Sequence, residues 1–433
     1  MIYPLSNIVN PAINTHLPNQ PFIRKFLFSL SVLLLAMWFV SFLIHEMAFG
    51  LFSVFLPVYI TGQVGGSLTD FGIMIAMANF VAVPFSFFWG YLCDKTRRYR
   101  FYILLSFSAM TVLLFLFSLT NIITILMVVY AAIAIFHVAH EAPKNVLISE
   151  YYSRTEWERS FASYEALIKL GWLSGLLLGF ALSGSGFAGM SLILLCSLLN
   201  LIAFTTSFFS IKDPLFVFER RLVAIERAVG FAHQGFSLVL KALDGMRIKE
   251  NLRNESVSMF CVGLLLFSLA TSMLFTPLPV FFSKDLGLSQ SLVFGIFVFD
   301  SLGSLWGYVL AGKRAQQLNG RDVVKKANLV RGVLALSLIL TIVWFSVFTL
   351  ALTVITLTIM GVAYGFFLIS TLSLSMELIP EGKAGMFNAL LGLGGALGCF
   401  LGTYTAANYG FCTLFLAASG GFFLSYIAFK TCK

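Results

Sequence analysis

Apolar stretches of about 20 residues, separated by short clusters of charge, follow one another along almost the whole chain. Of its 433 residues, 59% are hydrophobic and only 11% are charged. A water-soluble fold of this composition would have far more apolar surface than it could bury. An apolar stretch of this length can cross a lipid bilayer as a helix, which satisfies its own backbone hydrogen bonds where hydrocarbon offers none. The sequence therefore predicts an all-α integral membrane protein.

We predict about twelve membrane-spanning helices from the positions of these stretches. The expected spans are 32–60, 70–93, 101–120, 122–149, 160–183, 187–210, 256–283, 288–312, 327–348, 351–379, 385–408 and 410–429. The expected organisation is an N-terminal segment (1–26), a six-helix bundle (27–210), a linker (211–253) and a second six-helix bundle (254–433). Apolar residues alternate with charged ones at helical spacing in the linker, which predicts an amphipathic helix on the membrane surface.

The second half of the chain repeats features of the first at a nearly constant offset. GYLCDKTRR at Gly90–Arg98 returns in altered form as GKRAQQLNG at Gly312–Gly320, 222 residues later. Three glycines spaced four apart also return 223 residues later; they are Gly171, Gly175 and Gly179, and then Gly394, Gly398 and Gly402. Two similar halves in tandem, in so apolar a chain, are typical of transporters whose substrate passes between the halves.

The excess of basic residues, a formal net charge of +9, is distributed by loop. Lys and Arg gather in alternate loops and in the linker, so the positive-inside rule places both termini and the linker in the cytoplasm. The charge then reflects topology and contact with anionic lipid head groups at the plasma membrane, and we expect no nucleic-acid partner. The six cysteines show no paired spacing, so we expect free thiols, with no metal cluster and no disulfide. We also expect no cofactor and no resident metal.

A loop motif after the second span carries a family resemblance. Its residues Gly90, Leu92, Asp94, Lys95, Arg97 and Arg98 resemble the GxLxD(R/K)xGR(K/R) loop of the major facilitator superfamily, with Arg97 in place of the usual glycine. The resemblance covers the whole chain and implies two six-helix bundles, alternating access and a pathway complete in one monomer. It also implies that Gly90, Asp94, Lys95, Arg97 and Arg98 gate the change between conformations. The alternative is a solvated basic loop that only sets topology.

Ionisable residues inside the expected spans are functional candidates, because a charge at the bilayer centre costs about 3 kcal/mol. Glu46 lies at the middle of the first span, with His45 beside it. His137, His140, Glu141 and Lys144 share one face of the fourth span, because they are spaced by three and four residues. Glu165 and Lys169 form an i, i+4 pair on the fifth span.

The second half offers fewer candidates. Asp300 lies at the middle of the eighth span, where it is a possible second coupling site or an internal hydrogen-bond acceptor. Asn79 and Tyr364 are candidates for contact with a solute, although lone residues of these types more often serve packing. We expect Arg331 and Glu377 to reach the membrane surface from the ends of their spans.

Three interpretations of the first-half cluster remain open. In the first, Glu46 is a protonation site relieved by His45, His137 or His140, so that proton uptake drives the conformational change. In the second, His137, His140 and Glu141, with His45 and Glu46, bind a divalent metal as cargo, since imidazole and carboxylate suit zinc, iron or nickel. In the third, Glu141 with Lys144 and Glu165 with Lys169 are internal pairs that only hold spans together.

We therefore expect a proton-coupled secondary transporter of a small organic solute, of the drug or metabolite type, that works by alternating access. A divalent-metal transporter is the alternative, and a zinc-dependent membrane enzyme built on His137, His140 and Glu141 is a further one. The sequence contains no nucleotide-binding loop, nucleophile elbow or large extramembrane domain that would favour an enzyme. The identity of the solute and the direction of transport do not follow from the sequence.

Overall fold

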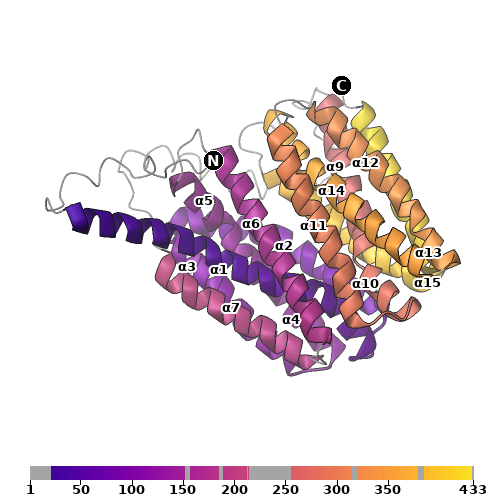
Figure 1. Cartoon of the computed structure of the whole chain (residues 1–433), viewed down its shortest axis with the longest axis horizontal. Helices are drawn as coiled ribbons and strands as arrows, with labels where there is room; N and C mark the ends of the chain where they lie inside the picture. Colours follow the sequence, from indigo (N-terminus) through magenta and orange to yellow (C-terminus); the bar gives the residue numbers. More distant parts are fainter. Residues whose placement is uncertain are drawn as a thin grey trace.

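The structure is a computed structural model that describes residues 21–151, 157–184, 189–211, 213, 255–314, 319–344, 346–378 and 385–431. All regular structure in these residues is helical, as the composition predicts for a chain in lipid. The expected linker helix falls at 214–254, outside the described residues. Figure 1 shows two helical bundles side by side, the first in indigo to magenta and the second in orange to yellow.

The first bundle contains six spans. Its elements are α1 (Pro21–Gly62), α2 (Leu68–Thr96), α3 (Tyr99–Ser118), α4 (Ile123–His137), the 3₁₀ turn η3 (Val138–His140), α5 (Glu141–Tyr151), α6 (Trp157–Gly184) and α7 (Met190–Ser210). Helix α1 begins at Pro21, inside the expected N-terminal segment 1–26. The fourth span is α4, η3 and α5 in succession, so a short change of helical winding interrupts it at the histidines.

The second bundle has the same plan. Its elements are α9 (Glu255–Phe275), α10 (Leu278–Val280), the π-helical turn η5 (Phe281–Asp285), α11 (Gln290–Arg314), α12 (Gly320–Ser337), α13 (Ile339–Val343), α14 (Val347–Leu378) and α15 (Gly385–Thr431). Helix α12 begins at Gly320, well before the expected start of its span at residue 327, because its charged first turns are helical although they are not apolar.

Eleven of the described helical segments are long and apolar enough to cross a membrane, and the last of them consists of two spans. Gly410 has non-helical backbone angles (φ 81°, ψ 168°) and divides α15. The part before Gly410 runs in the direction of α9, and the part after it runs the opposite way. The pairs that show this are Gly394 with Leu265 and Gly402 with Met273, and then Gly421 with Ala270 and Ser425 with Gly263. Counting both parts, the described residues form the predicted twelve spans.

The tandem repeat seen in the sequence reappears in the packing of the helices. Gly171 and Gly175 of α6 lie against the backbone carbonyls of Leu43 and Met47 in α1. Gly394 and Gly398 of α15 lie against the equivalent carbonyls of Leu265 and Leu269 in α9. Glycine is required at such positions because any side chain would overlap with the neighbouring backbone.

The bundles meet through α2 against α15 and α6 against α11. We call the end of the molecule with the α2–α3 turn, where Lys95, Arg97 and Arg98 lie, the basic end. Two hydrogen bonds join the bundles at the opposite end. Lys284 Nζ donates to the Thr61 carbonyl oxygen at 2.6 Å, and Ser291 Oγ donates to the Phe180 carbonyl oxygen at 2.9 Å.

Candidate functional site

The loop motif of the sequence lies at the basic end, where α2 ends. Asp94, Lys95 and Arg98 are exposed, and Gly90 packs against Ala142 of α5. Arg97 closes the helix in the left-handed conformation (φ 55°), with its N–H donating to the Cys93 carbonyl oxygen at 2.8 Å. A left-handed C-cap favours glycine, which explains why the related motif has glycine at this position.

Arg100, the next basic residue along the chain, holds the turn between α2 and α3 against the end of α7. The Arg100 backbone N–H donates to Asp213 Oδ1 at 2.8 Å, and its guanidinium donates to the Phe208 carbonyl oxygen. The guanidinium carbon also lies 4.9 Å from the centre of the Phe208 ring. The turn between α2 and α3 is therefore held against the sixth span, a contact that the sequence did not suggest.

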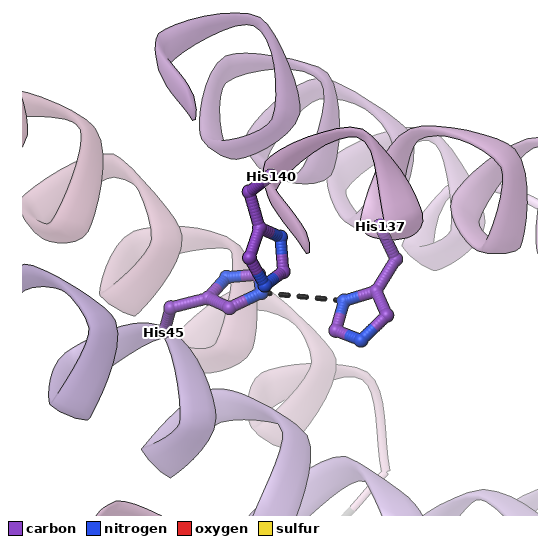
Figure 2. A group of neighbouring side chains, drawn as sticks. All are labelled: His45, His137 and His140. Carbon is purple, nitrogen blue, oxygen red and sulfur yellow. Dashed lines mark hydrogen bonds between the residues drawn. The ribbon is translucent and has the colours of Figure 1, made fainter. Parts of the chain in front are cut away.

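Three histidines that are far apart in the sequence meet inside the first bundle. His45 comes from α1, His137 from the end of α4 and His140 from η3, and Figure 2 shows their rings turned toward one another. His45 and His140 are fully buried, and His137 is partly buried. Each ring offers a nitrogen within 4.8 Å of the others. The helical spacing predicted the face that His137 and His140 share, and the structure places His45 opposite that face.

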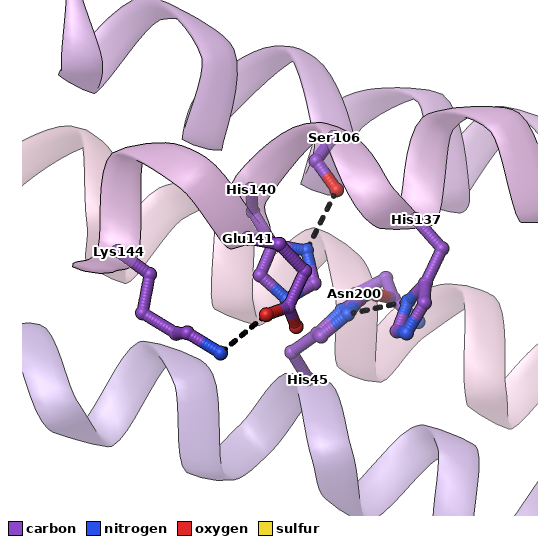
Figure 3. Close-up of polar contacts among 7 residues, drawn as sticks. All are labelled: His45, Ser106, His137, His140, Glu141, Lys144 and Asn200. Carbon is purple, nitrogen blue, oxygen red and sulfur yellow. Dashed lines mark hydrogen bonds and ion pairs between the residues drawn. The ribbon is translucent and has the colours of Figure 1, made fainter. Parts of the chain in front are cut away.

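Neighbouring spans hold two of these rings in place (Figure 3). His45 Nδ1 lies 2.7 Å from Asn200 Oδ1 of α7, and His140 Nδ1 lies 3.2 Å from Ser106 Oγ of α3. Asn200 and Ser106 are themselves fully buried. Neither residue is among the candidates predicted from the sequence, although an asparagine inside an apolar span is a polar group in hydrocarbon just as a histidine is.

Beside the histidines, Glu141 and Lys144 form an ion pair. Lys144 Nζ lies 2.5 Å from Glu141 Oε2, and Glu141 Oε1 lies 3.5 Å from His140 Nε2. The Glu141 side chain is 43% exposed, whereas that of Lys144 is 6% exposed. The internal pair considered from the sequence thus forms, and its carboxylate also borders the histidine cluster.

A second group of charges lies where the bundles meet. Lys169 of α6 places its Nζ 5.6 Å from the centre of the Trp172 ring and 5.8 Å from that of Tyr364 in α14 of the second bundle. The acidic groups that attract it electrostatically are Asp300 of α11, Glu46 and Glu165. Among the described residues no ion pair within 4.0 Å joins Glu165 to Lys169, so the structure does not show the second expected pair.

Glu46 faces α6 and not the histidine beside it in the sequence. It is 8% exposed, its Cβ lies next to Gly171, and both Lys144 and Lys169 attract it electrostatically. Asn79 of α2 also reaches the second bundle, where its Nδ2 lies 3.7 Å from Cys399 Sγ. The structure therefore brings Glu46, Asn79, Asp300 and Tyr364 to the region between the bundles.

The expectation that Arg331 reaches the membrane surface is wrong. Its side chain is 1% exposed and lies inside the second bundle. Four aromatic rings surround the guanidinium, with centres 4.9 to 5.4 Å away; they belong to Phe267, Phe275, Tyr364 and Phe422. Cation–π contacts of this kind stabilise a desolvated guanidinium by about 0.5–2 kcal/mol each, which makes a buried position tolerable. The Glu377 side chain lies outside the described residues.

A small cavity adjoins the rings around Arg331. Its volume is about 130 Å³, and its lining is Phe267, Ser268, Thr271, Ser272, Tyr364, Phe367, Leu368 and Leu391. The Thr271 hydroxyl and two guanidinium nitrogens of Arg331, Nε and Nη1, are buried without a hydrogen-bond partner. A larger cavity of about 520 Å³, lined by residues such as Phe281 and Thr341, lies near the opposite end and touches none of these charges.

This arrangement, with twelve spans in two related bundles and charges from both bundles at their junction, defines the class of multi-pass membrane transporters. Two comparisons identify the family. The family model of the Major Facilitator Superfamily matches residues 37–403, and the chain therefore belongs to that superfamily, as its loop motif indicated. No curated protein matches the chain by sequence.

Solved structures of transporters share the fold. A mutant form of the nucleoside transporter NupG superimposes with a TM-score of 0.70 at 14% identity, covering 92% of this chain and 99% of the other. A second NupG structure gives 0.66 at 15% identity, covering 92% and 98%. The human organic anion transporter MFSD10 (TETRAN) gives 0.62 at 16% identity, covering 92% and 99%. At these identities the likeness establishes the fold alone.

Proposed function

We propose that this transporter moves a small organic anion between its two bundles by alternating access, with a proton as the coupling ion. One observation carries the proposal: Lys169 of the first bundle and Arg331 of the second approach the same ring, with Lys169 Nζ 5.8 Å and the Arg331 guanidinium carbon 5.4 Å from the centre of Tyr364. A carboxylate or phosphate between Lys169 and Arg331 would receive charge-assisted hydrogen bonds, while the neighbouring rings contact an apolar part of the solute.

We infer a coupled proton because the bound anion and Asp300 would compete for the same two cations, Lys169 and Arg331. In the structure described here both Lys169 and Arg331 attract Asp300. A bound anion would take over those interactions and leave Asp300 as a carboxylate without compensation in a poorly hydrated place, where it gains by protonation. Anion and proton would then be carried together, and Glu46 would balance the charge of Lys169 and Lys144.

Alternating access needs the two ends to open in turn. The hydrogen bonds from Lys284 to Thr61 and from Ser291 to Phe180 keep the bundles together at the opposite end. In our proposal the loop at the basic end gates the change between conformations when that end closes. Its residues are the exposed Asp94, Lys95 and Arg98, with Gly90 and Arg97. We place the basic end and both termini in the cytoplasm, the protein in the plasma membrane and the complete pathway in a monomer.

The histidine cluster does not support metal ions as the cargo. The described hydrogen bonds and ring contacts of His45, His137 and His140 are all made to residues of the first bundle. A substrate carried between bundles should be reached from both of them. The charges around Lys169 meet that requirement, and we therefore put organic solute transport first.

Ligand binding to the purified protein tests the proposal. A substrate raises the melting temperature in detergent according to RT ln(1 + [L]/Kd), so a panel of organic anions, nucleosides, amino acids, sugars and organic cations can be compared directly. We expect dose-dependent stabilisation by organic anions, followed by uptake of the same compounds into proteoliposomes along a proton gradient.

Lys169→Gln should weaken anion binding at least tenfold. The matched control is Lys325→Gln, because Lys325 pairs with Asp322 at 2.6 Å on α12, a helix that packs against α14 and α15 of its own bundle. Stabilisation by cations or sugars only, or anion binding that survives Lys169→Gln unchanged, would count against the proposal.

A further inference from the structure

We propose that His45, His137 and His140 bind one divalent ion of a late first-row transition metal, of which zinc is the representative. This site is separate from the solute route and goes beyond the transport function proposed above. It also departs from the sequence-based expectation of a protein without a metal centre. The ion would be resident in the first bundle, where it would join the interrupted fourth span to α1.

The spacing of the ring nitrogens of His45 and His137 also fits one metal ion. His45 Nε2 and His137 Nδ1 lie 3.3 Å apart, where a hydrogen bond joins them in this structure (Figure 2). Two nitrogens that bind one tetrahedral zinc at about 2.0–2.1 Å are about 3.3 Å apart. The third ring, His140, offers a nitrogen within 4.8 Å of the other two, so a small rotation about its side-chain bonds would complete the set.

Polar side chains outside the cluster orient the His45 and His140 rings, as hydrogen bonds from outer residues orient metal-binding histidines. Asn200 Nδ2 donates to the Cys196 carbonyl oxygen at 2.8 Å, so Asn200 Oδ1 is the atom that accepts from His45 Nδ1–H. The lone pair of neutral His45 is then on Nε2, which points at the other histidines. Ser106 Oγ beside His140 Nδ1 can hold that ring in the same tautomer.

One nitrogen of the cluster lacks a hydrogen-bond partner. His140 Nε2 is fully buried and makes no hydrogen bond, although an unsatisfied buried polar atom costs about 1–3 kcal/mol. A bound ion would satisfy it. Glu141 Oε1 lies 3.5 Å from this nitrogen, and its half-exposed carboxylate can supply a fourth ligand and a negative charge close to the ion.

The chemistry of the ligands selects the metal. Neutral imidazoles favour zinc, copper, nickel or cobalt, whereas magnesium and calcium prefer a shell of oxygen ligands. The ligands come from α1, α4 and η3, all in one bundle. Such an ion would therefore make the first bundle more rigid as a body, and its removal would loosen the break in the fourth span.

Titration of the purified full-length chain with Co²⁺ tests the site, because cobalt in a tetrahedral nitrogen site gives intense visible absorption. The protein must carry an affinity tag without histidine and be stripped of metal first. We expect one cobalt per chain, displaced by Zn²⁺, and zinc should raise the melting temperature. His45→Gln and His140→Gln should weaken binding at least 100-fold, and Asn200→Ala about 10- to 100-fold.

His233→Gln is the matched control, since His233 is one of only two other histidines in the chain and lies far from α1 in the sequence. Lys169→Gln should bind cobalt as the wild type does, which separates this proposal from the transport proposal. If His45→Gln fails to fold, X-ray absorption of the zinc-loaded wild type decides, with three imidazole ligands expected. No stoichiometric binding, a site with fewer than two imidazoles, or binding unchanged in His140→Gln would overturn the site.

Discussion

Asp300 is the residue on which the coupling mechanism depends. It belongs to α11 of the second bundle, and its charge is attracted by Lys169 from the first bundle and by Arg331 from its own. In Asp300→Asn the two cations lose a competitor and the site can no longer take up a proton with the anion. We expect exchange of anion across proteoliposomes to continue, while accumulation driven by a pH gradient falls at least tenfold.

Asp322→Asn is the control for this substitution, because Asp322 is a surface carboxylate paired with Lys325. Exchange and accumulation should both stay at the wild-type level in that variant. If Asp300→Asn still accumulates anion along a pH gradient, Asp300 is not the coupling residue. Exchange and accumulation that fail together, in a protein that still binds anion, would also exclude this role.

The sequence predicted single residues unevenly. The spacing of His137, His140, Glu141 and Lys144 fixes their common face, because helical geometry acts over four residues. No local rule pairs His45 with Asn200, 155 residues away, since that contact depends on how α1 packs against α7. The predicted position of Arg331 at the membrane surface was wrong because the prediction assumed that its guanidinium needs contact with water. Four aromatic rings of the second bundle stabilise the guanidinium instead.

At the scale of the helices, glycines decide how closely α6 can approach α1. A methyl group at Gly175 would overlap with the Met47 carbonyl oxygen, whereas a methyl group at Gly420 would meet nothing within 4 Å. Gly175→Ala should therefore lower the melting temperature, since overpacking costs about 1–3 kcal/mol. Gly420→Ala should leave it unchanged or raise it slightly, because alanine is the better helix former.

Thermal unfolding of the purified variants in one detergent measures this difference. Equal melting temperatures for the Gly175→Ala and Gly420→Ala proteins would show that α6 and α1 are free to separate at Gly175. The same comparison can be made in the second bundle with Gly398, which lies against Leu269 of α9. Agreement between the two bundles would be expected, because the glycines of both lie against equivalent backbone carbonyls.

The positions of the helices were predicted well because each span is a continuous apolar stretch bounded by charge or by a turn. The exceptions have local physical causes. The 3₁₀ turn at Val138–His140 lies within a stretch that we predicted as one helix. Pro143 follows it and has no backbone N–H to donate to the Ala139 carbonyl, so the regular helical bonding is interrupted there. The charged first turns of α12 extend beyond the apolar part of the span, so hydrophobicity alone places its start too late.

For the molecule as a whole, transport requires that the bundles separate at the end where Lys284 now binds the Thr61 carbonyl. Cysteines at Thr61 and Lys284, in a background without native cysteines, should react with a short bifunctional thiol reagent. Uptake into proteoliposomes should then stop and recover when the link is cleaved. A matched link between positions 111 and 197, which are hydrogen-bonded within the first bundle, should leave uptake intact because each bundle moves as one body. Continued uptake with the Thr61–Lys284 link in place would mean that transport does not require this end to open, and that the solute does not pass between the bundles there.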